Sequence, residues 1–243
     1  MKKILTSMTL LGSLLSADFI GGEFNLGYYA HSPSGTISYK GDVLDLNDDL
    51  KLDTQSNIFL KAYIEHPLPF IPNIKLGYTD FTHKGDGKIA HDFKFAYFTF
   101  RNNQDLESHL NLKMYDMALY YEILDNWVSV DVGLNIKYID GYMSAQTLLS
   151  GKKSATINLP VPMLYGKARF DVPTTDLSFQ LEGNYIHYQK NEIIDVEIGA
   201  RYTFIAGLGV EVGYKTFQLM LDKDDTLMDA DFSGMYGKLV WDF

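Results

Sequence analysis

The chain has 243 residues, a formal net charge of −10, and 14% aromatic residues, with 17 Tyr and 15 Phe but only 2 Trp. The acidic balance argues against nucleic acid as a partner, because phosphate binding needs clustered Lys and Arg. The absence of cysteine excludes disulfides, thiolate metal sites, a cysteine nucleophile and lipid attachment through an N-terminal cysteine.

The N-terminus has the layout of a secretory signal peptide. Lys2 and Lys3 precede a mainly apolar stretch over residues 4–15, and Ala17 ends the segment. The stretch is too short to span ~30 Å of hydrocarbon, which disfavours the alternative of an anchoring helix, and no run of roughly 18 apolar residues follows it. We expect a cleaved signal peptide over residues 1–17. Its removal takes two lysines and no acid, so the net charge changes from −10 to −12.

Alternating apolar and polar residues predict ten strands in the rest of the chain. Successive side chains on a strand point to opposite faces, so each segment presents one apolar face and one polar or small face. The predicted strands cover approximately residues 19–31, 57–66, 74–82, 110–122, 127–138, 163–172, 177–188, 193–204, 208–220 and 232–243.

The pattern is clearest from Tyr115 to Tyr138. Every second residue from Val128 onward is apolar, and the residues between them are polar or small. The short connection at 124–126 is of the kind that joins antiparallel strands. The sequence therefore predicts an antiparallel hairpin here.

Residues 93–100, FKFAYFTF, form a further β-like segment. Counting them as a spanning strand would give an odd number, whereas bacterial single-chain barrels have an even number with both termini in the periplasm. We therefore place the segment in an extracellular extension. The apolar parity changes between Met114 and Tyr115, which predicts a β-bulge. Extracellular loops are expected near residues 32–56, 83–109, 140–156 and 222–231.

The apolar faces carry the aromatic girdles of a membrane barrel. They are aliphatic at mid-strand and aromatic towards the ends, with Tyr28, Tyr78, Tyr138 and Tyr214 near one rim and Phe170, Phe204, Trp241 and Phe243 near the other. Leu239, Trp241 and Phe243 share one face of the last strand, which is typical of a signal read by the bacterial barrel-assembly machinery.

These features predict an all-β, antiparallel, up-and-down barrel of ten strands over residues 18–243, located in the outer membrane. Barrels of eight or twelve strands and a secreted soluble β-sandwich are the alternatives. The expected partners are outer-membrane lipid and lipopolysaccharide, with the barrel-assembly machinery acting during insertion. No nucleic acid is expected.

The polar faces then line the lumen. A ten-stranded barrel leaves little free interior once side chains fill it. Eleven acids against eight bases predict an ion-pair network that plugs the lumen, and the rival interpretation is a narrow, weakly cation-preferring path. The predicted lumenal charges are Glu23, Lys61, Glu65, Lys75, Asp116, Glu122, Asp131, Lys137, Lys167, Arg169, Asp171, Glu182, Asp195, Glu197, Arg201, Glu211, Lys215, Lys238 and Asp242.

Catalytic and metal motifs are weak. His83, His91 and His109 fall in one predicted extracellular segment, but no helical His-x-x-x-His and no Gly-x-Ser-x-Gly is present. The acidic segments 42–53 and 222–231 lack the Gly and Glu positions of a calcium loop, so solvated loops are favoured over divalent binding. We predict no catalytic residue, cofactor or metal site.

Four segments resemble a family of small Gram-negative outer-membrane β-barrel proteins. They are EHPLPFIPNIKLGYTDF at 65–81, YDMALYYEILDNWVSVDVGL at 115–134, VPMLYGKARFDVP at 161–173 and the terminal aromatic strand. The resemblance implies location and fold, and it brings no assigned activity. We expect a structural or surface protein with at most a narrow polar lumen. The alternatives are a small-solute, weakly cation-preferring channel and, with less support, a hydrolase at the rim.

Overall fold

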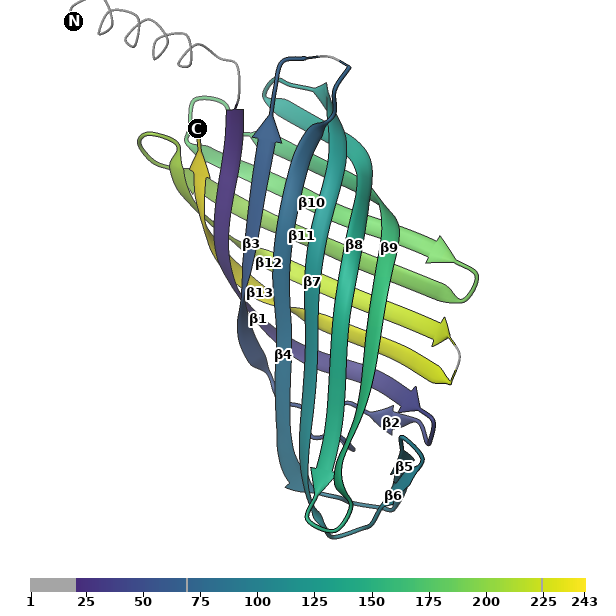
Figure 1. The fold of residues 1–243 in the computed structure, drawn as a ribbon. Helices are drawn as coiled ribbons and strands as arrows, with labels where there is room; N and C mark the ends of the chain where they lie inside the picture. Colours follow the sequence, from purple (N-terminus) through teal and green to yellow (C-terminus); the bar gives the residue numbers. More distant parts are fainter. Residues whose placement is uncertain (1–20, 69, 224) are drawn as a thin grey trace, which may run out of the picture.

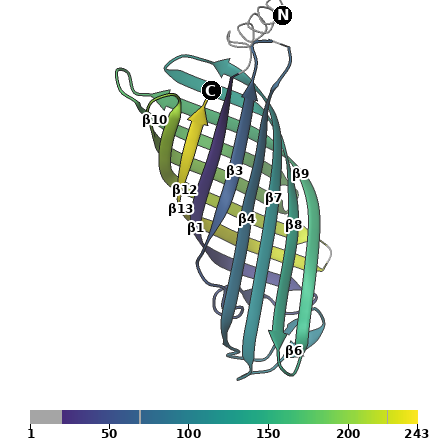
Figure 2. The same ribbon diagram turned by 60° about the vertical axis from the view of Figure 1, so that its left-hand side comes forward.

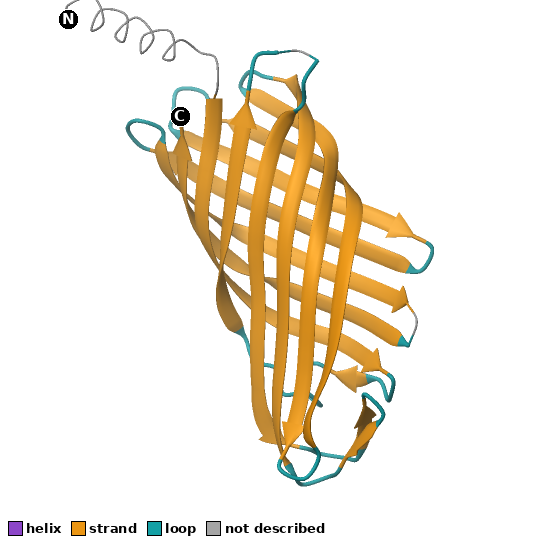
Figure 3. Cartoon of the chain, in the orientation of Figure 1, coloured by secondary structure: helices purple, strands orange, loops and turns teal. Residues whose placement is uncertain are grey.

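The structure is a computed structural model that describes residues 21–68, 70–223 and 225–243. The predicted signal peptide at 1–17 lies outside the described residues. Strands and loops make up the described chain (Figure 3). It contains no helix long and apolar enough to cross a membrane.

Ten long antiparallel strands form one closed barrel (Figures 1 and 2). Each strand pairs with its neighbours in chain order, and β13 pairs with β1 to close the wall. The strand number and the up-and-down topology predicted from the sequence are confirmed. The strands are β1 (Gly21–Tyr39), β3 (Gln55–Glu65), β4 (Asn73–Lys88), β7 (Asp105–Leu124), β8 (Val128–Thr147), β9 (Gly151–Asp171), β10 (Leu177–Tyr188), β11 (Asn191–Thr203), β12 (Leu208–Lys223) and β13 (Thr226–Asp242).

Three short strands lie at the end of the barrel opposite the C-terminus (Figure 1). β2 (Leu44–Asp45) pairs with the end of β1. β5 (Phe93–Phe95) and β6 (Phe98–Phe100) form a separate two-stranded hairpin. Residues 93–100 therefore lie outside the barrel wall, as predicted.

The strands on the extracellular side run well past their predicted ends. β8 and β9 are separated by residues 148–150 only, so most of the predicted loop 140–156 is strand. β12 and β13 leave two residues between them, which corrects the predicted loop 222–231. β1, β4 and β7 likewise extend into the predicted loops 32–56 and 83–109. The sequence pattern predicted strands that are too short, because the apolar face of these strands changes from the outer to the inner side of the barrel on the extracellular side of the membrane.

β7 shows this reversal directly. Leu110, Leu112 and Met114 point inward and are at most 2% exposed, whereas Tyr115 and Met117 point outward. No bulge separates the two sets, because the register between β7 and β8 is continuous from Glu107 to Glu122. The predicted bulge is therefore wrong. On the periplasmic side of the reversal the outer face meets lipid. On its extracellular side the outer face meets water and the interior is the apolar core.

An apolar band surrounds the periplasmic half of the barrel, which is drawn at the top of Figure 1. Its middle carries exposed aliphatic side chains such as Leu134 and Leu239, which are 65% and 61% exposed. At the extracellular edge of the band, the ring of Tyr115 lies 5.3 Å from the ring of Tyr78. At its periplasmic edge the rings of Trp127 and Phe170 lie 5.6 Å apart. These two aromatic edges fix the position of the membrane on the barrel.

Substitutions to Arg on the outer face of β7 are expected to locate the extracellular membrane boundary. Met117→Arg places a charge within the band, where it costs roughly 2–4 kcal/mol. Asn111→Arg makes a comparable change on the same face, on the extracellular side of the Tyr115 edge, where water solvates the charge, and we expect less than about 0.5 kcal/mol. Urea unfolding of both variants in phospholipid vesicles measures the difference. Equal losses would show that the band is misplaced.

Candidate functional site

All the predicted lumenal charges lie on the inner side of the barrel wall. Glu65, Glu122, Arg169, Asp171 and Asp242 line a vestibule of about 440 Å³ at the periplasmic mouth. The side chains of the other fourteen charges are at most 8% exposed, and three of them, Glu23, Asp131 and Lys167, also line the vestibule. Isolated buried charges are strongly destabilising, and thirteen of these fourteen side chains form ion pairs, the exception among the described residues being Asp131.

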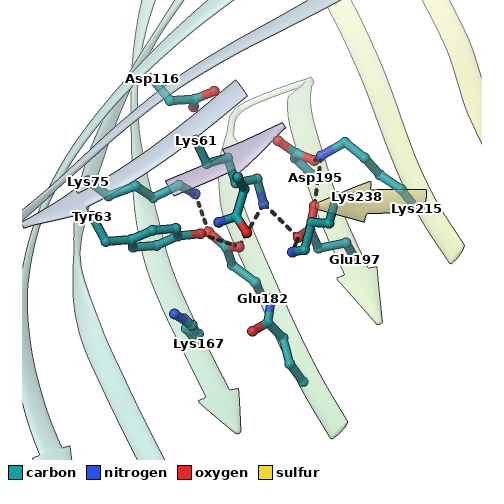
Figure 4. Close-up of polar contacts among 12 residues, drawn as sticks. Lys61, Tyr63, Lys75, Asp116, Lys167, Glu182, Asp195, Glu197, Lys215 and Lys238 are labelled. Atoms are coloured by element: carbon teal, nitrogen blue, oxygen red, sulfur yellow. Dashed lines mark hydrogen bonds and ion pairs between the residues drawn. The ribbon is translucent and has the colours of Figure 1, made fainter. Parts of the chain in front are cut away.

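Glu182 on β10 is the centre of the first group of ion pairs (Figure 4). Its carboxylate accepts hydrogen bonds from Lys61 at 2.7 Å and from the Tyr63 hydroxyl at 2.8 Å. Lys75 pairs with the other carboxylate oxygen. Lys61 also lies 2.6 Å from Glu197, which connects this group to the next.

Arg201 on β11 is the centre of the second group. Its guanidinium donates two 2.9 Å hydrogen bonds to Glu23 and one of 3.0 Å to Glu211. Lys238 lies 2.9 Å from Glu211 and 3.2 Å from Glu197, so the two groups form one network. This network crosses the lumen from β1 to β10, β11, β12 and β13.

A third group lies near the extracellular edge of the apolar band. Lys137 on β8 bridges Asp116 at 2.8 Å and Asp195 at 2.9 Å. Lys215 lies 2.6 Å from Asp195 (Figure 4). Acids and bases alternate through all three groups. The arrangement matches the predicted ion-pair plug more closely than a row of unpaired acids that would attract cations.

Aromatic side chains cover the extracellular side of the ion pairs. Tyr29, Phe59, Phe81, Phe217 and Phe232 come from five strands, and all have 0% exposure. The ring of Phe81 lies 5.3 Å from that of Phe217 and 5.4 Å from that of Phe232. We refer to these five residues as the aromatic layer. This layer lies between the charged lumen and the apolar core of the extracellular half.

The aromatic layer was not predicted from the sequence. The signal was present in Phe217 and Phe232, which share the parity of Lys215 and Gly234 on the inner faces of β12 and β13. Both residues lie inside the predicted strands 208–220 and 232–243, so their inward position could have been found from the sequence.

The three histidines of the predicted extracellular segment do not converge. His83 is buried against Phe232, and its Nδ1 lies 2.9 Å from the carbonyl oxygen of Asp53. His91 is 62% exposed and lies 3.5 Å from Asp49. His109 lies beside the ring of Tyr142. These three histidines therefore do not form one site.

The acidic segment 42–53 uses its carboxylates in local hydrogen bonds. Asp45 accepts from the backbone amides of Asn47 and Asp48, and Asp49 accepts from that of Asp45. Residues 222–231 are mostly strand rather than loop. Within the described chain, no three His, Asp or Glu side chains are grouped to hold a metal ion.

The closed barrel, its lipid-facing band and its polar lumen define an outer-membrane β-barrel protein. The structure of the outer-membrane protease OmpT from Escherichia coli is similar, with a TM-score of 0.58 and 12% identity over 94% of this chain and 98% of that one. The translocator domain of the autotransporter NalP from Neisseria meningitidis has a TM-score of 0.42 at 11% identity, covering 98% of this chain and 94% of that one. Ail, the attachment invasion locus protein of Yersinia pestis, has 0.40 at 8% identity, covering 92% and 99%.

The similarity to OmpT, at 12% identity, shows the fold alone. No protein-family model and no curated protein matches the sequence.

Proposed function

We propose that this protein is a closed outer-membrane barrel with a structural or surface role, and that it does not conduct solutes. The observation that supports this proposal is the aromatic layer, in which Tyr29, Phe81 and Phe232 have 0% exposure directly above a paired charge network. A hydrated path needs polar groups along its whole length, and the layer interrupts it. The vestibule at the periplasmic mouth is then a dead end.

The same proposal covers location and partners. The N-terminal segment directs export, and Leu239, Trp241 and Phe243 form the signal for insertion by the barrel-assembly machinery. Outer-membrane lipid and lipopolysaccharide surround the band between the aromatic edges. We propose no catalytic role, because the rim histidines lie apart from one another. The long extracellular half provides the surface that the protein exposes outside the cell.

Planar-bilayer recordings test the closed lumen. The refolded mature protein is expected to give no steady conductance at two salt concentrations, whereas a large porin in the same bilayers gives open-channel currents. A steady, cation-preferring current that falls in Glu197→Gln and Glu211→Gln would contradict the proposal. That result would instead establish the alternative of a small-solute channel.

A further inference from the structure

An apolar cavity of about 370 Å³ lies in the extracellular half of the barrel, above the aromatic layer. Inward-facing side chains of β1, β7, β8, β9, β12 and β13 line it, including Ile37, Leu112, Met143, Ile157 and Leu219. Small-molecule sites in proteins have volumes of about 300–1,000 Å³ and a mostly apolar lining. The size and lining of this cavity are those of a ligand site.

The barrel wall is open beside the cavity. β9 pairs with β10 only as far as Leu164, which faces Tyr185. Beyond that point β9 continues for residues 151–163 with no partner on its β10 side among the described residues (Figure 1). Ala155 and Ile157 point inward from this stretch and remain only half-buried. Apolar side chains on the inner face are thus accessible through the gap.

The free edge of β9 is poorly suited to pairing with another strand. Pro160 and Pro162 cannot donate to a ladder, and Lys152 and Lys153 place charges near the strand end. Natural sheet edges use these same residue types to prevent strand addition. A small molecule that fills the gap therefore fits the sequence of β9 better than a second copy of the chain.

The mouth of the cavity carries a cation. The Lys40 ammonium lies 5.3 Å from the Tyr39 ring centroid and 5.1 Å from that of Tyr97. In the part of the chain that the structure describes, no carboxylate forms an ion pair with Lys40. Lys223 and Asp225 complete the charged part of the lining. An anionic group at the mouth would meet Lys40, while an apolar tail enters the cavity.

We propose that this cavity binds a single alkyl chain with an anionic head group, that is, a free fatty acid taken from the medium. The alkyl chain of the fatty acid lies between the free edge of β9 and the ends of β12 and β13, and its carboxylate lies at Lys40. This site is separate from the closed lumen, and it does not depend on whether the lumen conducts.

Fatty-acid titration of the refolded barrel tests the site. The protein is held in amphipol, so that no detergent competes, and a fluorophore is attached to Thr156→Cys, which is the only cysteine in the chain. Octanoate, decanoate and dodecanoate are expected to give saturable signals, with affinity rising about fourfold per added CH₂. Calorimetry on the unlabelled protein provides an independent measurement.

Two matched variants test whether the alkyl chain of the fatty acid lies in the cavity. Ala155→Phe fills the cavity from β9 and should weaken dodecanoate binding at least tenfold. Ser154→Phe adds a similar bulk to the opposite face of the same strand and should leave binding unchanged. Both variants must keep heat-modifiable migration on unboiled gels, which shows that they are folded. Equal binding in both would overturn the assignment, as would the absence of any saturable signal.

A head-group comparison tests the role of Lys40 and the source of the ligand. Lys40→Gln should weaken dodecanoate severalfold and leave dodecanol unaffected. If lauroyl-lysophosphatidylglycerol binds and dodecanoate does not, the occupant is a membrane lipid and the fatty-acid proposal fails. A stable dimer by light scattering that also excludes dodecanoate would overturn it in favour of a second copy of the chain.

Discussion

Replacing Arg201 with Met is expected to destabilise the barrel by roughly 3–5 kcal/mol, because the substitution leaves buried carboxylates without a partner. Arg201 is 1% exposed and binds Glu23 and Glu211 at once. Met has a similar length and fills the space, so the loss reports the charge rather than a cavity. Urea unfolding in phospholipid vesicles, followed by the fluorescence of Trp127 and Trp241, measures it.

A matched ion pair on the surface provides the control. Arg101 and Asp92 lie 2.7 Å apart, but their side chains are 67% and 47% exposed. Arg101→Met should therefore cost about 0–1 kcal/mol. A similar loss at both positions would show that the lumenal network is hydrated and that the closed lumen is wrong. Adding Glu211→Gln to Arg201→Met should recover part of the stability, because it removes one of the unpaired charges.

The fold was predictable because a period of two residues survives in every membrane-spanning segment. The inward residues of β11, such as Asp195, Glu197 and Arg201, are polar, and the outward residues between them are apolar or small. That alternation fixes which face meets lipid. It also identified the lumenal charges as a set, because a charged side chain in a lipid-facing position would be destabilising.

The partners of those charges were not predictable. Arg201 binds Glu23 across 178 positions of sequence, and Lys61 binds Glu182 across 121. Such contacts depend on strand tilt and on the stagger of the closed barrel, which the hydrophobic pattern of single strands does not specify. The sequence predicted the number of strands, but it did not predict which charged side chains pair across the lumen.

The extracellular core was missed because its alternation is reversed. Leu219 and Leu221 point inward from β12, whereas Val210 and Val212 on the same strand point outward to lipid. If the apolar face is assumed to stay on one side along the whole strand, this change of parity suggests that the strand ends there. The physical rule is that the apolar face follows the solvent, and the solvent changes at the tyrosine edge.

The same reversal places His31 and His83 in a dry environment above the membrane-spanning part of β1 and β4. The ring of His31 lies 4.5 Å from Tyr29, 4.7 Å from His83 and 4.8 Å from Phe81. Burial and, to a smaller extent, the neighbouring His83 lower the pKa of His31 to about 3, although the hydrogen bond to Asn57 acts in the opposite direction. Burial also lowers the pKa of His83.

The sign of the pH effect follows from these directions. The pKa of His31 is about 3 in the folded state and about 6.5 when unfolded, so the unfolded chain binds the proton first as the pH falls. Stability is therefore fully present above about pH 6.5 and is lost progressively below it. Between pH 7 and pH 4 the loss from His31 alone is about 3 kcal/mol. His83 adds to it in the same direction.

Urea unfolding at pH 7 and pH 4 measures this acid sensitivity. His31→Phe keeps an aromatic ring beside Phe81 and removes the titrating group, so we expect it to abolish about 3 kcal/mol of the difference between the two pH values. His91→Phe makes the same change at a position that is 62% exposed and should leave the difference unchanged. If His31→Phe retains the full difference, the lumenal and vestibular carboxylates rather than the buried histidine would carry the pH dependence.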